Sequence, residues 1–88
     1  GNLLGSNLPS IKINSKDINN NLTMIDLVIV SKLESSKSET RRLIKGNAIK
    51  LNDKIISDEK LIIKDQLFHN NYLKLSIGKK RHIKINKN

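Results

Sequence analysis

The chain has 88 residues, contains no cysteine and carries a formal net charge of +9 at neutral pH. This length fits one small domain, and the lack of cysteine excludes a disulfide framework and any thiolate metal site. Aromatic residues make up only 2% of the sequence, so a core of Leu, Ile and Val leaves little room for an enclosed ligand cavity and disfavours a small-molecule enzyme. Because His69 and His82 are far apart in the sequence, we expect no metal or other cofactor.

The first 21 residues are predicted to be a linker and an irregular segment. Residues 1–10 contain two glycines and the single proline, with leucines that follow no period, which is typical of a linker. Residues 11–13 alternate as Ile-Lys-Ile and predict a short edge strand, whereas residues 14–21 are polar, turn-rich and at most loosely helical. We therefore expect the domain itself to span residues 22–88.

Residues 22–32 are predicted to form a buried helix, with a strand as the competing interpretation. Their apolar residues are too dense for an edge strand, and Asn21 or Thr23 is a suitable N-cap with Asp26 in the first turn. Residues 33–35 then form a short link, so a second helix is expected close by.

The second helix is predicted to begin at Lys37 and to be strongly basic. Ser36 and Glu39 have the spacing of a capping box, and Gly46 is predicted to be a left-handed C-terminal cap. At about 100° per residue, one stripe of this helix is apolar and another is cationic; the cationic stripe contains Lys37, Arg41, Arg42 and Lys45. Within the helix only Glu39 opposes these charges, so either an external anion or a merely solvated helix face explains them.

Two β-hairpins are predicted after the basic helix. In the first, residues 49–51 and 54–56 flank Asn52 and Asp53, which both tolerate the positive φ of a two-residue turn. In the second, residues 72–77 alternate between apolar and polar, and the apolar face resumes after a cationic turn that contains Lys79, Lys80 and Arg81. That turn is either an RNA contact or a solvated tip that discourages edge aggregation.

The segment between the hairpins is predicted to be mostly irregular. Residues 57–60 form a polar turn, residues 61–64 a possible short strand, and residues 65–71 a loop in which Phe68 anchors to the core. The fold class predicted from these elements is α+β: a small single domain with two short helices packed on antiparallel hairpins.

The positive charge lies in the part of the chain that begins with the basic helix. Before Ser36 three lysines face three acidic residues, whereas fourteen Lys and Arg face five acidic residues after it. Such a domain is expected to meet a polyanion, most commonly nucleic acid, with anionic lipid as the weaker alternative. The sequence has no apolar run of about 20 residues and no signal-peptide pattern, so we expect a soluble, cytoplasmic protein without membrane contact.

Residues 33–52 carry a recognisable motif, Ser-Ser-Lys-Ser-Glu-x-Arg-Arg-Leu-Ile followed by Ile-Lys-Leu-Asn. This motif resembles the αL RNA-binding domain first described in the S-four protein of the small ribosomal subunit. The flanks, with Ser-Asp-Glu at 57–59, Asp-Gln-Leu-Phe at 65–68 and Leu-x-Leu-x-Ile-Gly-Lys-Lys at 73–80, are similar to the C-terminal domain of bacterial tyrosyl-tRNA synthetases. The resemblance covers roughly residues 23–85, and Asp53 departs from the glycine that is usual in that hairpin turn.

The resemblance implies that the domain grips tRNA(Tyr) at its long variable arm and near the anticodon stem. It also implies that ATP and tyrosine react in a Rossmann-type catalytic domain that is absent from this segment, which then holds no catalytic residue, cofactor or small-molecule substrate. A stand-alone RNA-binding module of a ribosome-associated or heat-shock protein is the alternative, and a protein-interaction domain with acidic partners is a third.

The candidate RNA-binding residues combine the basic helix with the lysines of both hairpins. Tyr72 and Phe68 are the only aromatic residues, so stacking on unpaired bases is not expected to be the main mode, and we expect recognition of the backbone shape of a structured RNA. The predicted site consists of Ser36, Lys37, Ser38, Arg41, Arg42, Lys45, Lys50, Lys54, Lys79, Lys80 and Arg81.

Overall fold

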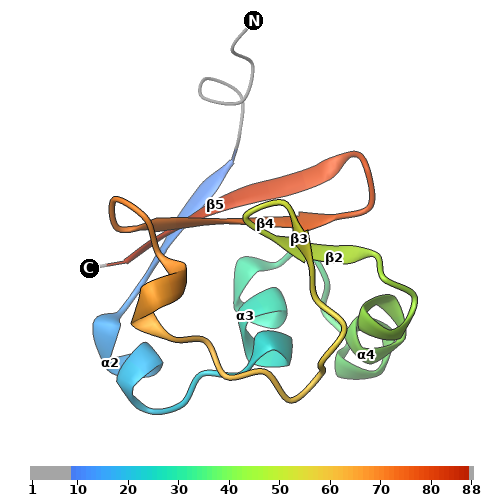
Figure 1. The fold of residues 1–88 in the computed structure, drawn as a ribbon, viewed down its shortest axis with the longest axis horizontal. Coiled ribbons are helices and arrows are strands. Elements are labelled where there is room, and N and C mark those ends of the chain that lie inside the picture. Colours follow the sequence, from blue (N-terminus) through green and yellow to red (C-terminus); the bar gives the residue numbers. More distant parts are fainter. Residues whose placement is uncertain (1–8, 88) are drawn as a thin grey trace, which may run out of the picture.

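The computed structural model describes residues 9–87, so most of the predicted linker, residues 1–8, lies outside the described part. The described residues form two layers (Figure 1): a five-stranded sheet, and helices that all lie on one face of it. This arrangement confirms the predicted α+β class.

The sheet has the strand order β1-β5-β4-β2-β3. Both predicted hairpins are present: β2 pairs antiparallel with β3, and β4 pairs antiparallel with β5 along its whole length. The predicted edge strand is also present and pairs parallel with β5, from Ser10 opposite Lys84 to Ile13 opposite Lys87. The strands are β1 (Ser10–Ile13), β2 (Ile49–Leu51), β3 (Lys54–Ile55), β4 (Tyr72–Ile77) and β5 (Arg81–Lys87).

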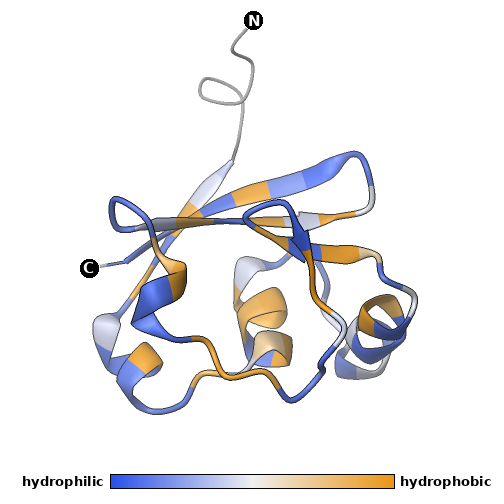
Figure 2. Cartoon of the chain, viewed as in Figure 1, coloured by the Kyte–Doolittle hydropathy of each residue, from blue (hydrophilic) through white to orange (hydrophobic). Residues whose placement is uncertain are grey.

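The helical layer contains both predicted helices and two further elements. The described α-helices are α2 (Ser15–Asn19), α3 (Met24–Ser31) and α4 (Lys37–Lys45), and a short 3-10 helix, η1, spans Asp65–Leu67. Figure 2 shows that α3 is hydrophobic over most of its length, whereas α4 carries both hydrophobic and hydrophilic residues. Accordingly α3 is the central buried helix and α4 is a surface helix.

The boundaries of α3 follow from local hydrogen bonds. The Thr23 hydroxyl accepts a hydrogen bond from the Asp26 amide at 3.1 Å, which is the predicted N-cap. The helix ends at Ser31 because Lys32 has a φ of 67° in the left-handed region. The Ser31 hydroxyl then donates to the Val28 carbonyl and accepts from the Leu33 amide, so the link to α4 begins in a fixed direction.

Part of the segment before residue 22 belongs to the packed unit. Residues 15–19 form α2, and Ile13 and Ile18 are both at least 93% buried in the same core as the later elements. The sequence did not predict this packing, because β1 is one short strand and α2 is little more than one helical turn. Neither element is long enough for its apolar residues to show a period. The packed unit therefore includes residues 10–21.

The core lies between the sheet and the helices. It is built mainly from the inward-facing residues of β2, β4 and β5 together with α3 and Ile44 of α4. Phe68, which follows η1, is 8% exposed and joins this core, as predicted. The predicted strand at residues 61–64 is reduced to a single bridge between Ile62 and Thr23, because the segment pairs with the start of α3 and not with the sheet.

Candidate nucleic-acid interface

Helix α4 is held at both ends by local caps. The Ser36 hydroxyl accepts from the Glu39 amide at 3.2 Å, which confirms the predicted N-cap. The predicted left-handed cap at Gly46 is wrong: Gly46 has a φ of −86°, and Asn47 has a φ of 61°. The Asn47 amide donates to Ile44 and the Ala48 amide donates to Leu43, which is a Schellman motif with asparagine in the left-handed position.

The buried stripe of α4 fixes which side chains face solvent. Thr40 and Ile44 are fully buried, and the Thr40 hydroxyl donates to the Ser36 carbonyl at 2.8 Å. The four cations of the helix are all exposed. The predicted division of α4 into a core stripe and a cationic stripe is therefore present in the fold.

Three of the four cations on α4 lie near a carboxylate. Arg42 contacts Glu39 within the helix at 2.9 Å, and packing places Glu59 and Asp26 beside the helix, with Arg41 Nε 4.0 Å from Glu59 and Lys37 Nζ 3.9 Å from Asp26. The expectation that Glu39 alone opposes these charges therefore holds only within the helix. Such exposed pairs contribute about 0–1 kcal/mol each, so an anionic ligand can displace them at little cost.

The turn between β4 and β5 is bonded to the chain segments on either side of α4. The Gly78 amide donates to the carbonyl of Ala48, just after α4, at 2.9 Å. Arg81 donates to the carbonyl of Leu33, just before α4, also at 2.9 Å. The hairpin that carries Lys79 and Lys80 is thus fastened to the chain segments that precede and follow α4.

The remaining cations of this region differ in their partners. Within residues 9–87, no carboxylate lies within 4.0 Å of the ammonium groups of Lys45, Lys79 or Lys80. Arg81, by contrast, combines its bond to Leu33 with a carboxylate of Glu34 at 3.8 Å. Arg81 is therefore a structural tether of the hairpin tip, whereas the three lysines keep their charge free for a ligand. We call Lys37, Arg41, Arg42, Lys45, Lys79 and Lys80 the α4 ridge.

The two lysines of the first hairpin point to opposite sides of the sheet. Lys50 lies between the buried residues Ile49 and Leu51, so its side chain projects from the face away from the helices. Lys54 pairs with Leu51 at the sheet edge and is exposed. The structure therefore separates Lys50 from the other predicted site residues.

The turn of the first hairpin has the predicted geometry. Asn52 and Asp53 have φ angles of 52° and 70°, as a two-residue hairpin turn requires. Asp53 accepts from Lys74 Nζ at 2.7 Å, and this hydrogen bond and the lysine charge lower the pKa of the Asp53 carboxyl below its ordinary value. Aspartate replaces glycine in this turn without loss of the turn type.

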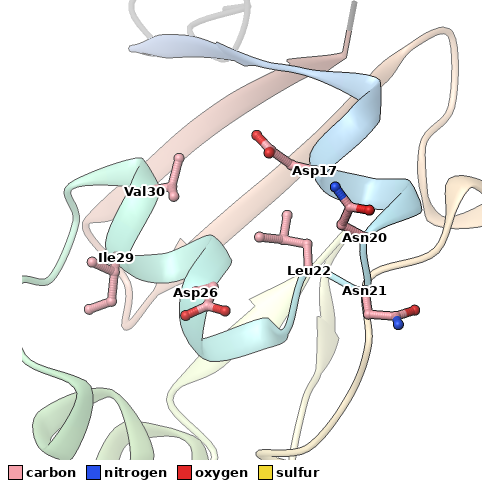
Figure 3. A pocket seen from close by; sticks show the side chains of 7 residues that line it. All are labelled: Asp17, Asn20, Asn21, Leu22, Asp26, Ile29 and Val30. Atoms are coloured by element: carbon pink, nitrogen blue, oxygen red, sulfur yellow. The ribbon is translucent and has the colours of Figure 1, made fainter.

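The remaining candidate features do not add to a polyanion site on the helical side. Both ring nitrogens of His82 are engaged, one with the Ser76 hydroxyl at 2.8 Å and one with the Lys79 carbonyl at 3.0 Å. A groove of about 340 Å³ lies between α2 and α3 (Figure 3), and the carboxylates of Asp17 and Asp26 line it. These carboxylates disfavour an anionic ligand there.

Three lysines on the helix-free side of the sheet were missed as site candidates. Lys12, Lys74 and Lys84 occupy positions that alternate with buried residues on β1, β4 and β5. The alternation was visible in the sequence, but only the order of the strands places the three on one surface.

No helix among residues 9–87 has both the length and the apolar character needed to cross a membrane. In the same range, His, Asp and Glu side chains do not gather into a group of three or more that suits a metal ion.

Taken together, these elements define a small α+β domain that presents a capped basic helix and a basic hairpin tip. The chain belongs to the family described as tyrosine–tRNA ligase SYY-like C-terminal domain, whose model matches residues 2–85. The resemblance inferred from the motif is confirmed.

Curated relatives agree with this family. The chain is 60% identical over 84 residues to a tyrosine–tRNA ligase of Pelagibacter ubique, covering 96% of the chain and 20% of the relative. It is 42% identical over 82 residues to the tyrosine–tRNA ligase of Bartonella quintana, and the match covers 92% of the chain and 20% of that relative. It is 44% identical over 79 residues to the tyrosine–tRNA ligase of a Wolbachia strain, and the match covers 89% of the chain and 19% of that relative. The chain thus spans about a fifth of the length of these relatives.

Proposed function

We propose that this domain binds structured RNA, specifically tRNA(Tyr), through the α4 ridge, as part of a longer tyrosine–tRNA ligase whose catalytic domain attaches the amino acid. The observation that carries the proposal is the set of exposed cations on α4 and the adjoining tip, three of which have no carboxylate within 4.0 Å among residues 9–87. The relatives are tyrosine–tRNA ligases, which supports tRNA(Tyr) as the RNA.

The ridge is suited to phosphates on chemical grounds. Arginine and lysine side chains on one rigid helix meet a regular backbone without reading bases, and the exposed hydroxyl of Ser38 adds a hydrogen-bond donor near the helix N-terminus. The Ser36 hydroxyl already accepts from the Glu39 amide, so its own proton remains available for a phosphate oxygen. The ridge therefore recognises the shape of a structured RNA through contacts to the RNA backbone.

The salt dependence of binding tests the ridge. If four to six phosphates are neutralised, the slope of log K against log salt is about −3 to −5, which is roughly a 10²- to 10³-fold loss between about 50 and 200 mM salt. Arg41→Ala and Arg42→Ala should each flatten the slope by about one unit. The matched control is Lys16→Ala, an exposed lysine on α2. A slope near zero, or an equal effect of the control, contradicts the proposal.

The choice of RNA is tested separately. A gel-shift comparison of tRNA(Tyr) with a tRNA that lacks a long variable arm should show tighter binding of tRNA(Tyr). Equal affinity with a steep salt slope would instead assign the ridge to a general RNA-binding module.

A further inference from the structure

The face of the sheet that points away from the helices is covered by none of the described helices (Figure 1). On β4 and β5 the buried residues, such as Leu73 and Ile83, alternate with residues that project to this face. The pairing register places Lys12 of β1, Lys50 of β2 and Ile55 of β3 on the same side. We call this surface the open sheet face; the residues that matter for binding are Lys12, Lys50, Ile55, Tyr72, Lys74 and Lys84.

The open sheet face is cationic. All four charged residues at its strand positions are lysines, and Lys74 and Lys84 stand directly opposite each other on β4 and β5. Like charges in directly opposed positions destabilise a sheet. Lys74 is offset by Asp53 at the edge, but no carboxylate within residues 9–87 lies within 4.0 Å of the ammonium groups of Lys12, Lys50 or Lys84. A bound polyanion would remove this repulsion.

An accessible aromatic ring lies among these lysines. Tyr72 is 37% exposed, and the Lys84 ammonium lies 4.4 Å from its ring centroid. Lys12 is in the same row of the sheet, because it pairs with Asn86 and Asn86 pairs with Tyr72. Two strand spacings separate them, about 10 Å. The Lys84 ammonium therefore lies over one face of the ring, and Lys12 stands in the same row of the sheet.

This combination has a specific chemistry. Lysines bind phosphates, and a tyrosine ring offers its π-face to a base, which is how proteins hold single-stranded nucleic acid. An acidic protein segment would match the charge but gain little from the ring. Duplex RNA would match the charge too, but its paired bases are not available to stack.

We propose that the open sheet face binds a single-stranded stretch of nucleic acid, with one unpaired base stacked on Tyr72 and neighbouring phosphates at Lys12, Lys74 and Lys84. This surface is separate from the α4 ridge, so it adds a contact beyond the proposed function. It also adds one stacked base to a domain in which the sequence predicts contacts to the backbone.

The test uses the only tyrosine of the chain as its reporter. The ring proton resonances of Tyr72 are followed by NMR while a single-stranded RNA of about eight nucleotides is added. An abasic strand of the same length and charge serves as the ligand control. We expect an upfield shift of the Tyr72 ring protons with the RNA and little shift with the abasic strand, because only a stacked base produces the ring-current effect.

Variants then separate stacking from charge. Tyr72→Phe should keep the affinity for the single strand, and Tyr72→Ala should weaken it about 5- to 100-fold, the range for loss of one stacked base. Lys12→Ala and Lys84→Ala should weaken binding of RNA and of the abasic strand alike, whereas Lys16→Ala on α2 should change neither. If Tyr72→Ala fails to fold, the NMR comparison of the RNA with the abasic strand on the unchanged chain still tests whether a base stacks on Tyr72.

Several outcomes overturn the proposal. They are the absence of a Tyr72 shift, an equal shift with the abasic strand, an equal loss in Lys16→Ala, and equally tight binding of a polyglutamate peptide, which would make an acidic protein segment the occupant. The double variant of Arg41 and Arg42 distinguishes the two surfaces. The Tyr72 shift should persist in that variant, so failure of the ridge and failure of the open sheet face are recognised independently.

Discussion

The guanidinium of Arg81 donates a hydrogen bond to the backbone carbonyl of Leu33 at 2.9 Å, across 48 positions of the chain. This bond joins the tip of the β4–β5 hairpin to the link that precedes α4. Because it sets the position of Lys79 and Lys80 relative to α4, it determines the shape of the α4 ridge although Arg81 is itself engaged.

Replacing Arg81 should therefore affect stability more than replacing its neighbours. Arg81→Ala removes a charge-assisted bond from a half-exposed site, and we expect a loss of about 1 kcal/mol in the free energy of unfolding, measured with urea. Lys80→Ala, in the same turn, should stay within about 0.5 kcal/mol of the unchanged chain. Equal losses in both variants would show that the turn charge, and not the tether, stabilises the tip.

The side chain of Asn52 bridges three parts of the domain. Its amide nitrogen donates to the Leu67 carbonyl at 2.8 Å, and its oxygen accepts from the Lys74 amide at 3.1 Å. Asn52→Gly keeps the positive φ but loses both bonds, so we expect about 1–3 kcal/mol of destabilisation in thermal or urea unfolding. Asp53→Gly, the neighbouring change in the same turn, should cost less than Asn52→Gly, because the ion pair of Asp53 with Lys74 is exposed to solvent. A larger destabilisation in Asp53→Gly than in Asn52→Gly would contradict the bridging role of the Asn52 side chain.

Asp53 should make stability depend on pH in the acid range. Since Lys74 lowers the folded-state pKa of Asp53, the carboxylate stabilises the fold at pH values above its unfolded pKa. This contribution is lost as the pH falls through the folded pKa. Asp53→Asn should flatten that part of the stability profile, and Lys74→Met should return the pKa of Asp53, followed by NMR, toward its ordinary value. An unchanged pKa in Lys74→Met would rule out Lys74 as the cause.

Ser36 and Ser38 should respond differently although both are predicted RNA contacts. The Ser36 hydroxyl caps α4, so Ser36→Ala should destabilise the chain by about 1 kcal/mol. Ser38 is exposed on the first turn, and Ser38→Ala should leave the unfolding free energy within about 0.5 kcal/mol. If both hydroxyls also bind phosphate, both variants weaken RNA binding in a gel shift under conditions where each is folded. If neither variant weakens RNA binding, the two hydroxyls are not part of the proposed site.

Local features were predictable because residues within a few positions of one another produce them. The caps at Thr23 and Ser36 and the Asn52–Asp53 turn depend on side chains near the backbone groups that they satisfy. The left-handed cap of α4 was misplaced by one residue, since asparagine accepts that conformation almost as readily as glycine. The strand at residues 61–64 was overestimated because a short apolar run does not reveal its pairing partner.

A small basic α+β domain with a capped cationic helix could be inferred from the sequence alone, because charge, caps and periodicity are properties of neighbouring residues. Which charges meet depends on the tertiary structure. It brought Asp26 and Glu59 to α4, tied Arg81 to Leu33, and paired β1 with β5 so that Lys12 joins Tyr72 and Lys84 on the open sheet face. Such contacts join residues far apart in the chain, and they depend on how the sheet and helices bury their common core.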